Sequence, residues 1–164
     1  MEELVWGIVT FFGAWQTVAV LSVGVLIWYS WNGAYTRLTQ FVLSGVIIAV
    51  LVWGLKEYFA IDRPAGGAVH GDTKYSFPSG HAAFATFLYG WCMYVMFLSR
   101  YRLLYRYGIS GLLLAIIIAI AGSRVTLGAH FVADVVAGVG VGTLALVLGI
   151  GLGQIIWYTR GCNS

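Results

Sequence analysis

Long uncharged stretches dominate the pattern of hydrophobic and polar positions along this chain. Charged residues bound five such windows, at residues 4–36, 38–55, 75–99, 107–123 and 135–159. A helix rises about 1.5 Å per residue, so about 20 apolar residues cross a hydrocarbon core about 30 Å thick. Each window is therefore long enough, or nearly so, to form a membrane-spanning helix.

The first window is too long for one span and too short for two. Gly13 divides it into a short apolar segment, residues 4–12, and a full span over residues 14–31. The other spans are predicted over residues 39–59, 81–99, 104–122 and 131–158. The sequence thus predicts an all-α integral membrane protein, a bundle of five to six transmembrane helices that forms a single domain over residues 1–164.

The composition excludes an ordinary soluble domain. Hydrophobic residues make up 60% of the chain, charged residues only 9%, and the mean hydropathy is +0.88, whereas about a quarter of the residues in a soluble domain are charged. We therefore expect the lipid bilayer as a partner, and no nucleic acid. The two cysteines offer neither a disulfide framework nor a cysteine metal motif.

The charged residues between the predicted spans separate onto two faces of the membrane. One face carries arginine alone, namely Arg37, Arg100, Arg102, Arg106 and Arg160. The other mixes bases with acids, namely Lys56, Arg63, Lys74 and Arg124 with Glu57, Asp62, Asp72 and Asp134. The positive-inside rule assigns the arginine face to the cytoplasm. We therefore expect a multi-pass plasma membrane protein with its mixed-charge face outside, away from ATP, which argues against a kinase.

Polar residues suited to chemistry gather in three segments of that outer face, within residues 56–134. In the last of these, His130 and Asp134 are four residues apart, which on a helix would place them on the same side. A carboxylate that accepts a hydrogen bond from one imidazole nitrogen leaves the other free as a nucleophile. The alternative is a buried structural pair that joins two helices.

The last span continues with a stripe of small residues, Gly138, Gly142, Gly149 and Gly153. Such a stripe lets a neighbouring helix approach closely, within one chain or between two copies. It therefore predicts that the His130 and Asp134 pair points into a helix bundle. It makes no prediction of oligomeric state.

The middle segment is a Pro-Ser-Gly turn, residues 78–80, followed by His81 in the first turn of a span. We expect the backbone N–H groups of Ser79, Gly80 and His81 to be free to bind an anion at the positive end of the helix. The alternative is an ordinary helix start with Ser79 as N-cap.

Three cations accompany these segments: Lys56, Arg63 and Arg124. Guanidinium groups match phosphate oxygens bidentately, although a lysine near a span end can instead extend to the lipid headgroups. Two histidines and an aspartate could ligate a metal, but three nearby cations oppose a dication and favour a phosphoanion. We expect no metal and no organic cofactor.

Taken together, the three segments resemble the signature of the type 2 phosphatidic acid phosphatase superfamily, which also includes the vanadium haloperoxidases. The pattern is Lys, six residues, Arg-Pro; then Pro-Ser-Gly-His; then Ser-Arg, five residues, His, three residues, Asp. The matching residues are Lys56, Arg63 and Pro64; residues 78–81; and Ser123, Arg124, His130 and Asp134. The chain is short for this family, whose membrane members typically have six spans.

The resemblance implies a role for each group. His130, oriented by Asp134, attacks phosphorus and forms a phosphohistidine, and His81 protonates the leaving oxygen. The phosphoryl oxygens are held by Lys56, Arg63, Ser79, Gly80 and Arg124. Water then hydrolyses the intermediate. His70, Asp72 and Lys74 are assigned no catalytic role.

The implied function is that of a membrane lipid phosphatase with its active site at the extracytoplasmic interface. Among lipid phosphates, a polyprenyl diphosphate such as undecaprenyl diphosphate is favoured over phosphatidylglycerol phosphate and phosphatidate, because a small outward-facing enzyme suits carrier-lipid recycling. Three alternatives stay open: a phosphotransferase that uses an alcohol in place of water, a vanadate-dependent haloperoxidase, and a membrane scaffold with a decaying site.

Overall fold

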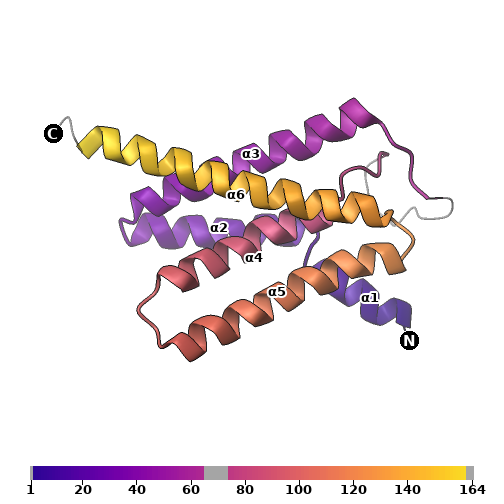
Figure 1. The fold of residues 1–164 in the computed structure, drawn as a ribbon, viewed down its shortest axis with the longest axis horizontal. Coiled ribbons are helices and arrows are strands. Elements are labelled where there is room, and N and C mark those ends of the chain that lie inside the picture. The colour runs from indigo at the N-terminus through magenta and orange to yellow at the C-terminus, as the bar shows by residue number, and fades with distance from the viewer. Residues whose placement is uncertain (1, 65–73, 162–164) are drawn as a thin grey trace.

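The computed structural model describes residues 2–64 and 74–161, and His70 and Asp72 lie outside these ranges. Six helices make up this part of the chain (Figure 1): α1 Glu2–Phe11, α2 Trp15–Trp31, α3 Tyr35–Phe59, α4 Gly80–Leu98, α5 Leu103–Thr126 and α6 Val132–Gly161. The described residues form no strand beyond one isolated bridge, between Asp62 and Tyr75. The predicted all-α fold is confirmed.

Five stretches of the described chain are long and apolar enough to cross a membrane: Leu4–Trp31, Tyr35–Phe59, Gly80–Leu98, Leu103–Thr126 and Val132–Thr159. This agrees with the predicted bundle of five to six spans. The predicted break at Gly13 is also confirmed, because α1 ends at Phe11 and α2 begins at Trp15. Two boundaries were wrong by four residues, since α3 begins at Tyr35 and not at residue 39, and α5 continues past residue 122 to Thr126.

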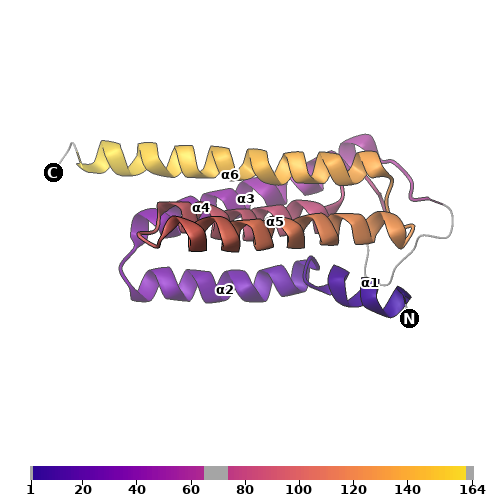
Figure 2. The same cartoon turned by 60° about the horizontal axis from the view of Figure 1, so that its bottom comes forward.

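The long helices α2 to α6 run side by side along the long axis of the molecule (Figures 1 and 2). The α2–α3 and α4–α5 connections lie at one end, which we call the arginine end because Arg37, Arg100, Arg102 and Arg106 belong to it. At the other end α1 packs against α5, α3 ends, α4 begins and α5 turns into α6. We call this the site end.

The predicted small-residue stripe of α6 packs within the chain. A Cβ added at Gly138 would lie 2.5 Å from the carbonyl oxygen of Ser79, and one at Gly142 would lie 2.6 Å from that of Ala83. Further along, Gly153 faces α3 in the same way. The close approach brings the beginnings of α4 and α6 together, and with them two of the three polar segments.

An aromatic cluster holds α2, α3 and α4 together. The rings of Phe41 and Phe87 stack with centroids 5.0 Å apart, and the indole of Trp91 donates a hydrogen bond of 3.1 Å to the hydroxyl of Tyr29. The only other buried residue of α2 is Val18. Because few α2 side chains are buried, this helix covers its neighbours loosely.

Candidate active site

The three polar segments converge on one cavity at the site end. Its volume is about 300 Å³, and the polar residues that line it are Lys56, Arg63, Gly80, His81 and His130. Its apolar lining comes from Trp15, Ala49, Val52, Trp53 and Phe84. Residues from three separate motifs, predicted to act together, therefore surround the same space.

Lys56 lies in the last turn of α3 and is only 7% exposed. Its ammonium donates a hydrogen bond of 2.9 Å to the carbonyl oxygen of Tyr75. The alternative that Lys56 extends to the headgroups is wrong, because its side chain is buried in the protein. Arg63 approaches the same carbonyl, with Nη2 at 3.4 Å.

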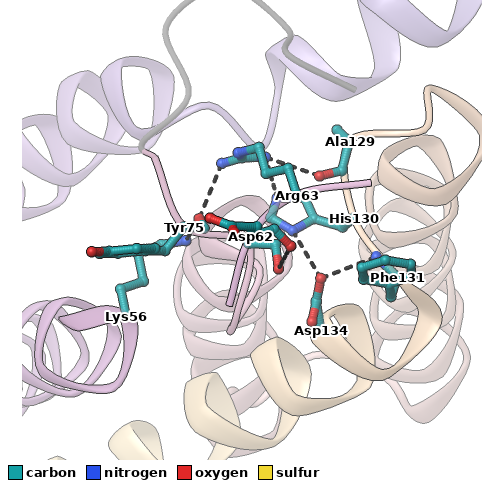
Figure 3. A network of polar contacts seen from close by, with 9 residues as sticks. Lys56, Asp62, Arg63, Tyr75, Ala129, His130, Phe131 and Asp134 are labelled. Carbon is teal, nitrogen blue, oxygen red and sulfur yellow. Dashed lines mark hydrogen bonds and ion pairs between the residues drawn. The ribbon is translucent and has the colours of Figure 1, made fainter. Parts of the chain in front are cut away.

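The carbonyl of Tyr75 thus orients two of the three cations (Figure 3). Its own position is held by the bridge between Asp62 and Tyr75 and by a hydrogen bond of 2.8 Å from the Ser76 N–H to the Ile61 carbonyl. Sequence reasoning did not find Tyr75, because a backbone carbonyl contributes through its position and not through its residue type.

Arg63 also determines which ring nitrogen of His130 carries the proton. Its Nη1 donates to the Ala129 carbonyl at 2.9 Å and lies 3.3 Å from Nε2 of His130 (Figure 3). A guanidinium has only donors, so Nε2 must be the acceptor, and the proton of the neutral ring belongs on Nδ1. The nucleophilic lone pair therefore points toward Arg63 and the cavity.

The electrostatic setting keeps this imidazole neutral. Burial, as the largest cause, and then the positive charges of Arg63, Arg124 and Lys56 and the nearby His81 together lower the pKa of His130 from 6.5 to about 3. On its other side, Nδ1 lies 3.5 Å from Oδ2 of Asp134 and has no other partner among the described residues. At that length the contact is weak until the ring moves closer.

Asp134 and His130 meet for a different reason from the one expected. They were predicted to share a helix face, but α6 begins at Val132, so His130 precedes the helix and that prediction is wrong in detail. Asp134 is the third helical residue, and its Oδ2 accepts a hydrogen bond of 3.0 Å from the N–H of Phe131. This is the return half of a capping box, which folds the preceding turn over the carboxylate.

The start of α4 also differs from expectation. The N–H of Ser79 was predicted to be free for an anion, but it donates to the Asp134 carbonyl at 2.9 Å and joins the second motif to the third. The alternative of an ordinary helix start is correct in position, because Ser79 is the N-cap residue of α4, but the Ser79 hydroxyl makes no capping bond. That hydroxyl is fully buried and has no hydrogen-bond partner among the described residues.

Arg124 is not among the residues that line the cavity, but it is close enough for its positive charge to act on His130. It is only 1% exposed, and its carbonyl accepts hydrogen bonds from the N–H groups of Ala129 at 3.1 Å and His130 at 3.2 Å. Because α5 extends to Thr126, Arg124 sits on the last helical turn. Its Nη1 donates to the hydroxyl of Thr10 on α1 at 3.0 Å.

An apolar groove of about 420 Å³ lies between α2 and α3, with α4 as its floor. It shares Trp15, Ala49 and Phe84 with the site cavity, so the two spaces adjoin. Its other lining residues, which include Val46 and Phe87, lie within membrane-spanning helices. A polar cavity at the bundle end thus adjoins an apolar groove within the membrane-spanning part.

Comparison with known proteins assigns the chain to a family. The sequence model of the PAP2 superfamily matches residues 38–158, which is most of the chain. The chain belongs to the PAP2 superfamily. The resemblance noted from the three motifs is therefore confirmed, and all three motifs fall within the matched residues.

Two further comparisons identify similar proteins. Phosphatidylglycerophosphatase B of Bacillus subtilis (strain 168) is 36% identical over 99 residues, which cover 57% of this chain. The match spans about half, 47%, of that protein's length. The crystal structure of a transmembrane PAP2-type phosphatidylglycerolphosphate phosphatase from Bacillus subtilis has a TM-score of 0.75 and 27% identity, covering 94% of this PAP2 chain and 78% of that one.

The crystal structure of Aquifex aeolicus LpxE shares the fold, with a TM-score of 0.66 and 22% identity over 92% of this chain and 86% of that one. Together with the transmembrane structure from Bacillus subtilis, these likenesses establish this PAP2 chain as a multi-span membrane protein.

Proposed function

We propose that this PAP2 protein is a membrane-embedded phosphatase that hydrolyses the phosphate ester or diphosphate of a lipid. One observation carries the proposal: a cavity lined by His130, His81 and two cations adjoins an apolar groove inside the bundle. The cavity suits a phosphate, because the buried Lys56 and the half-buried Arg63 can stabilise the charge that develops on its oxygens. The groove suits a hydrocarbon chain.

The first chemical step is attack by Nε2 of His130 on phosphorus. A P–N bond forms while the bond to the lipid oxygen breaks, and His81 supplies a proton to that leaving oxygen. The proton on Nδ1 then faces the Asp134 carboxylate, which stabilises the positive charge on the ring. The low pKa of free His130, about 3, keeps the attacking nitrogen unprotonated before substrate arrives.

The second step releases phosphate. His81 takes a proton from water, the water oxygen attacks phosphorus, and the P–N bond breaks to restore neutral His130. Throughout, the charge on the phosphoryl oxygens is balanced by Lys56, Arg63, Arg124 and the Ser79–Gly80 region. In this scheme the positive charge comes from the protein's own side chains, and no metal or organic cofactor takes part.

Two headgroups are the main candidates. The proposed outward-facing site favours a polyprenyl diphosphate. Phosphatidylglycerol phosphate is supported by the relatives, since two similar proteins are named as phosphatases of that lipid. Both present a terminal phosphate on a long hydrocarbon, which the cavity and groove accommodate.

The proposal is tested with purified protein in detergent and chelator. Phosphate release is measured from polyprenyl diphosphate, phosphatidylglycerol phosphate and phosphatidate, for wild type and His130→Ala. We expect release that survives chelation and disappears in the variant, and the panel ranks the substrates. Loss of activity on chelation, or activity retained in His130→Ala, would contradict the mechanism.

The same samples separate hydrolysis from phosphoryl transfer. With a lipid alcohol present, a hydrolase releases labelled phosphate into water. Label that moves instead to the alcohol, with little free phosphate, would replace hydrolysis by phosphotransfer as the second step.

A further inference from the structure

The short helix α1 lies outside the residues that match the family, yet it contacts the candidate site. Thr10 is in its last turn, and the hydroxyl of Thr10 accepts a hydrogen bond of 3.0 Å from Nη1 of Arg124. The two residues are 114 positions apart, so only the docking of α1 against α5 brings them together.

The junction between α1 and α2 is held against the same region by two further contacts. The hydroxyl of Tyr89 donates to the Phe12 carbonyl at 3.0 Å. Gly13 is buried, and a Cβ added there would lie 3.4 Å from the His81 carbonyl and would overlap Ile120. Contacts with residues of α4 and α5 therefore hold the segment that carries Thr10 in place.

We propose that Thr10 is a positioning residue for Arg124, and that α1 thereby completes the phosphate-binding part of the site. This inference rests on the proposed function. Thr10 touches no substrate and acts through the guanidinium of Arg124. It goes beyond the three motifs, none of which includes a residue before Lys56.

The chemistry of the contact explains why a hydroxyl stands at this position. Arg63, Arg124 and Lys56 surround His130 closely enough for each to affect it. Their mutual repulsion favours movement of the Arg124 side chain away from the others when phosphate is absent. A neutral acceptor holds the guanidinium in place and leaves its positive charge available, whereas a carboxylate would neutralise that charge.

The test measures binding of inorganic phosphate by isothermal titration calorimetry, together with KM and kcat for the lipid phosphate. The variants are Thr10→Val, Thr10→Ser and Thr10→Asp. The control is Thr17→Val, because the Thr17 hydroxyl is buried and has no hydrogen-bond partner among the described residues. Melting temperature is recorded for every protein.

We expect Thr10→Val to weaken phosphate binding by about ten-fold and to raise KM in parallel, since one hydrogen bond to a charged group is lost. Thr10→Ser and Thr17→Val stay within about two-fold of wild type on the same grounds. Thr10→Asp keeps the contact and the fold, and it nevertheless weakens phosphate binding because it neutralises Arg124.

Equal phosphate affinity in wild type, Thr10→Val and Thr10→Asp would overturn the inference. So would a loss in Thr10→Val that Thr10→Ser does not rescue and that follows the melting temperature, since that would make Thr10 a docking contact only. Phosphate binding needs no turnover. A protein that shows the expected differences in phosphate binding yet hydrolyses no lipid would therefore contradict the proposed function and leave the inference about Thr10 intact.

Discussion

His130 is surrounded by positive charge and holds none itself. Nε2 accepts from Arg63 while Nδ1 faces Asp134, which fixes the orientation of the ring, and burial together with the nearby cations keeps the ring neutral. A phosphoanion that enters the cavity reverses this setting, because its charge offsets the cations that lower the pKa. His130 is thus a neutral nucleophile before the substrate binds. Once the phosphoanion is bound, a positive charge on the ring costs less free energy.

The lowered pKa of His130 makes a prediction for pH. The pKa falls from an ordinary 6.5 to about 3 in the folded protein, so between these values the unfolded chain binds a proton that the native one does not. The contribution of His130 to the free energy of unfolding is therefore fully present above pH ~6.5 and is lost as pH falls toward ~3. Nitrogen NMR of labelled histidine should show His130 neutral from pH 8 to pH 5.

The same titration tests the cause of the shift. Arg63→Gln removes a nearby positive charge and should raise the pKa of His130, whereas Arg102→Gln at the arginine end should leave it unchanged. A His130 signal that titrates near pH 6.5 in the wild-type protein without phosphate would contradict the account of its electrostatics.

Side chains within the three motifs were predictable from the sequence, and partners from outside the motifs were not. His130, His81, Lys56 and Arg63 were found because their chemistry and spacing are visible in the sequence, and the structure brings them to one cavity. The carbonyl of Tyr75 carries no such signal. Neither does the hydroxyl of Thr10, because nothing local links it to Arg124.

At the scale of the helices, glycine determines how closely α6 approaches its neighbours. Gly142→Ala places a methyl group against the backbone of α4, which should destabilise the protein by about 1–3 kcal/mol and lower activity by shifting α4 relative to α6. Gly140→Ala is the matched control, since a Cβ there meets nothing within 4 Å. Thermal unfolding in detergent compares the two, and equal melting temperatures would refute the packing argument.

The groove between α2 and α3 makes a prediction about lipid chains. Val46 lines the groove, whereas Val50, one turn further, lines neither the groove nor the cavity, and both are exposed, at 56% and 61%. Val46→Trp should reduce hydrolysis of a long-chain lipid phosphate by roughly ten-fold or more, since each methylene displaced from apolar contact costs about 0.8 kcal/mol.

Two comparisons make the groove result specific. Val46→Trp should still hydrolyse a short-chain, water-soluble analogue at the wild-type rate, and Val50→Trp should resemble wild type on both substrates. An equal effect of the two variants on the long-chain lipid would mean that the hydrocarbon chain lies elsewhere.

The ends of the helices were predicted closely where a hydrophobic stretch stops at a turn. They were predicted less closely where the hydrophobic stretch stops at a polar residue that is still part of the helix. The break at Gly13 and the starts of α4 and α6 fall within one residue of their predicted places. The end of α5 was placed four residues early because Ser123 and Arg124 resemble a loop. Both are instead fully or almost fully buried, with Ser123 bonded to the Ile120 carbonyl.

For the whole molecule, charge distribution makes a prediction of orientation. The site end and the arginine end are opposite ends of the bundle, as the two predicted charge sets required (Figure 1). By the positive-inside rule we propose that the site end faces out of the cell. In a variant whose native cysteines are replaced, a cysteine at Lys74 should react with a membrane-impermeant maleimide in intact cells, and one at Arg102 should not. The reverse labelling would invert the topology.

The groove is the feature of the whole molecule that could not be predicted from the sequence. Hydropathy indicated the spans, but the groove depends on which side chains of α2, α3 and α4 leave space between them, a property of packing in three dimensions. The three ordered motifs were enough to predict the family from the sequence. The position of the groove proposed for the lipid chain could not be predicted in this way.

The most direct test of the central claim is to trap the phosphohistidine. Protein mixed with labelled lipid phosphate is quenched in alkali during turnover, and the modified residue is mapped by mass spectrometry. The account predicts alkali-stable, acid-labile phosphate on His130 in the wild type and none in His130→Ala, which also lacks turnover. Phosphate on another residue, or full turnover in His130→Ala, would contradict it.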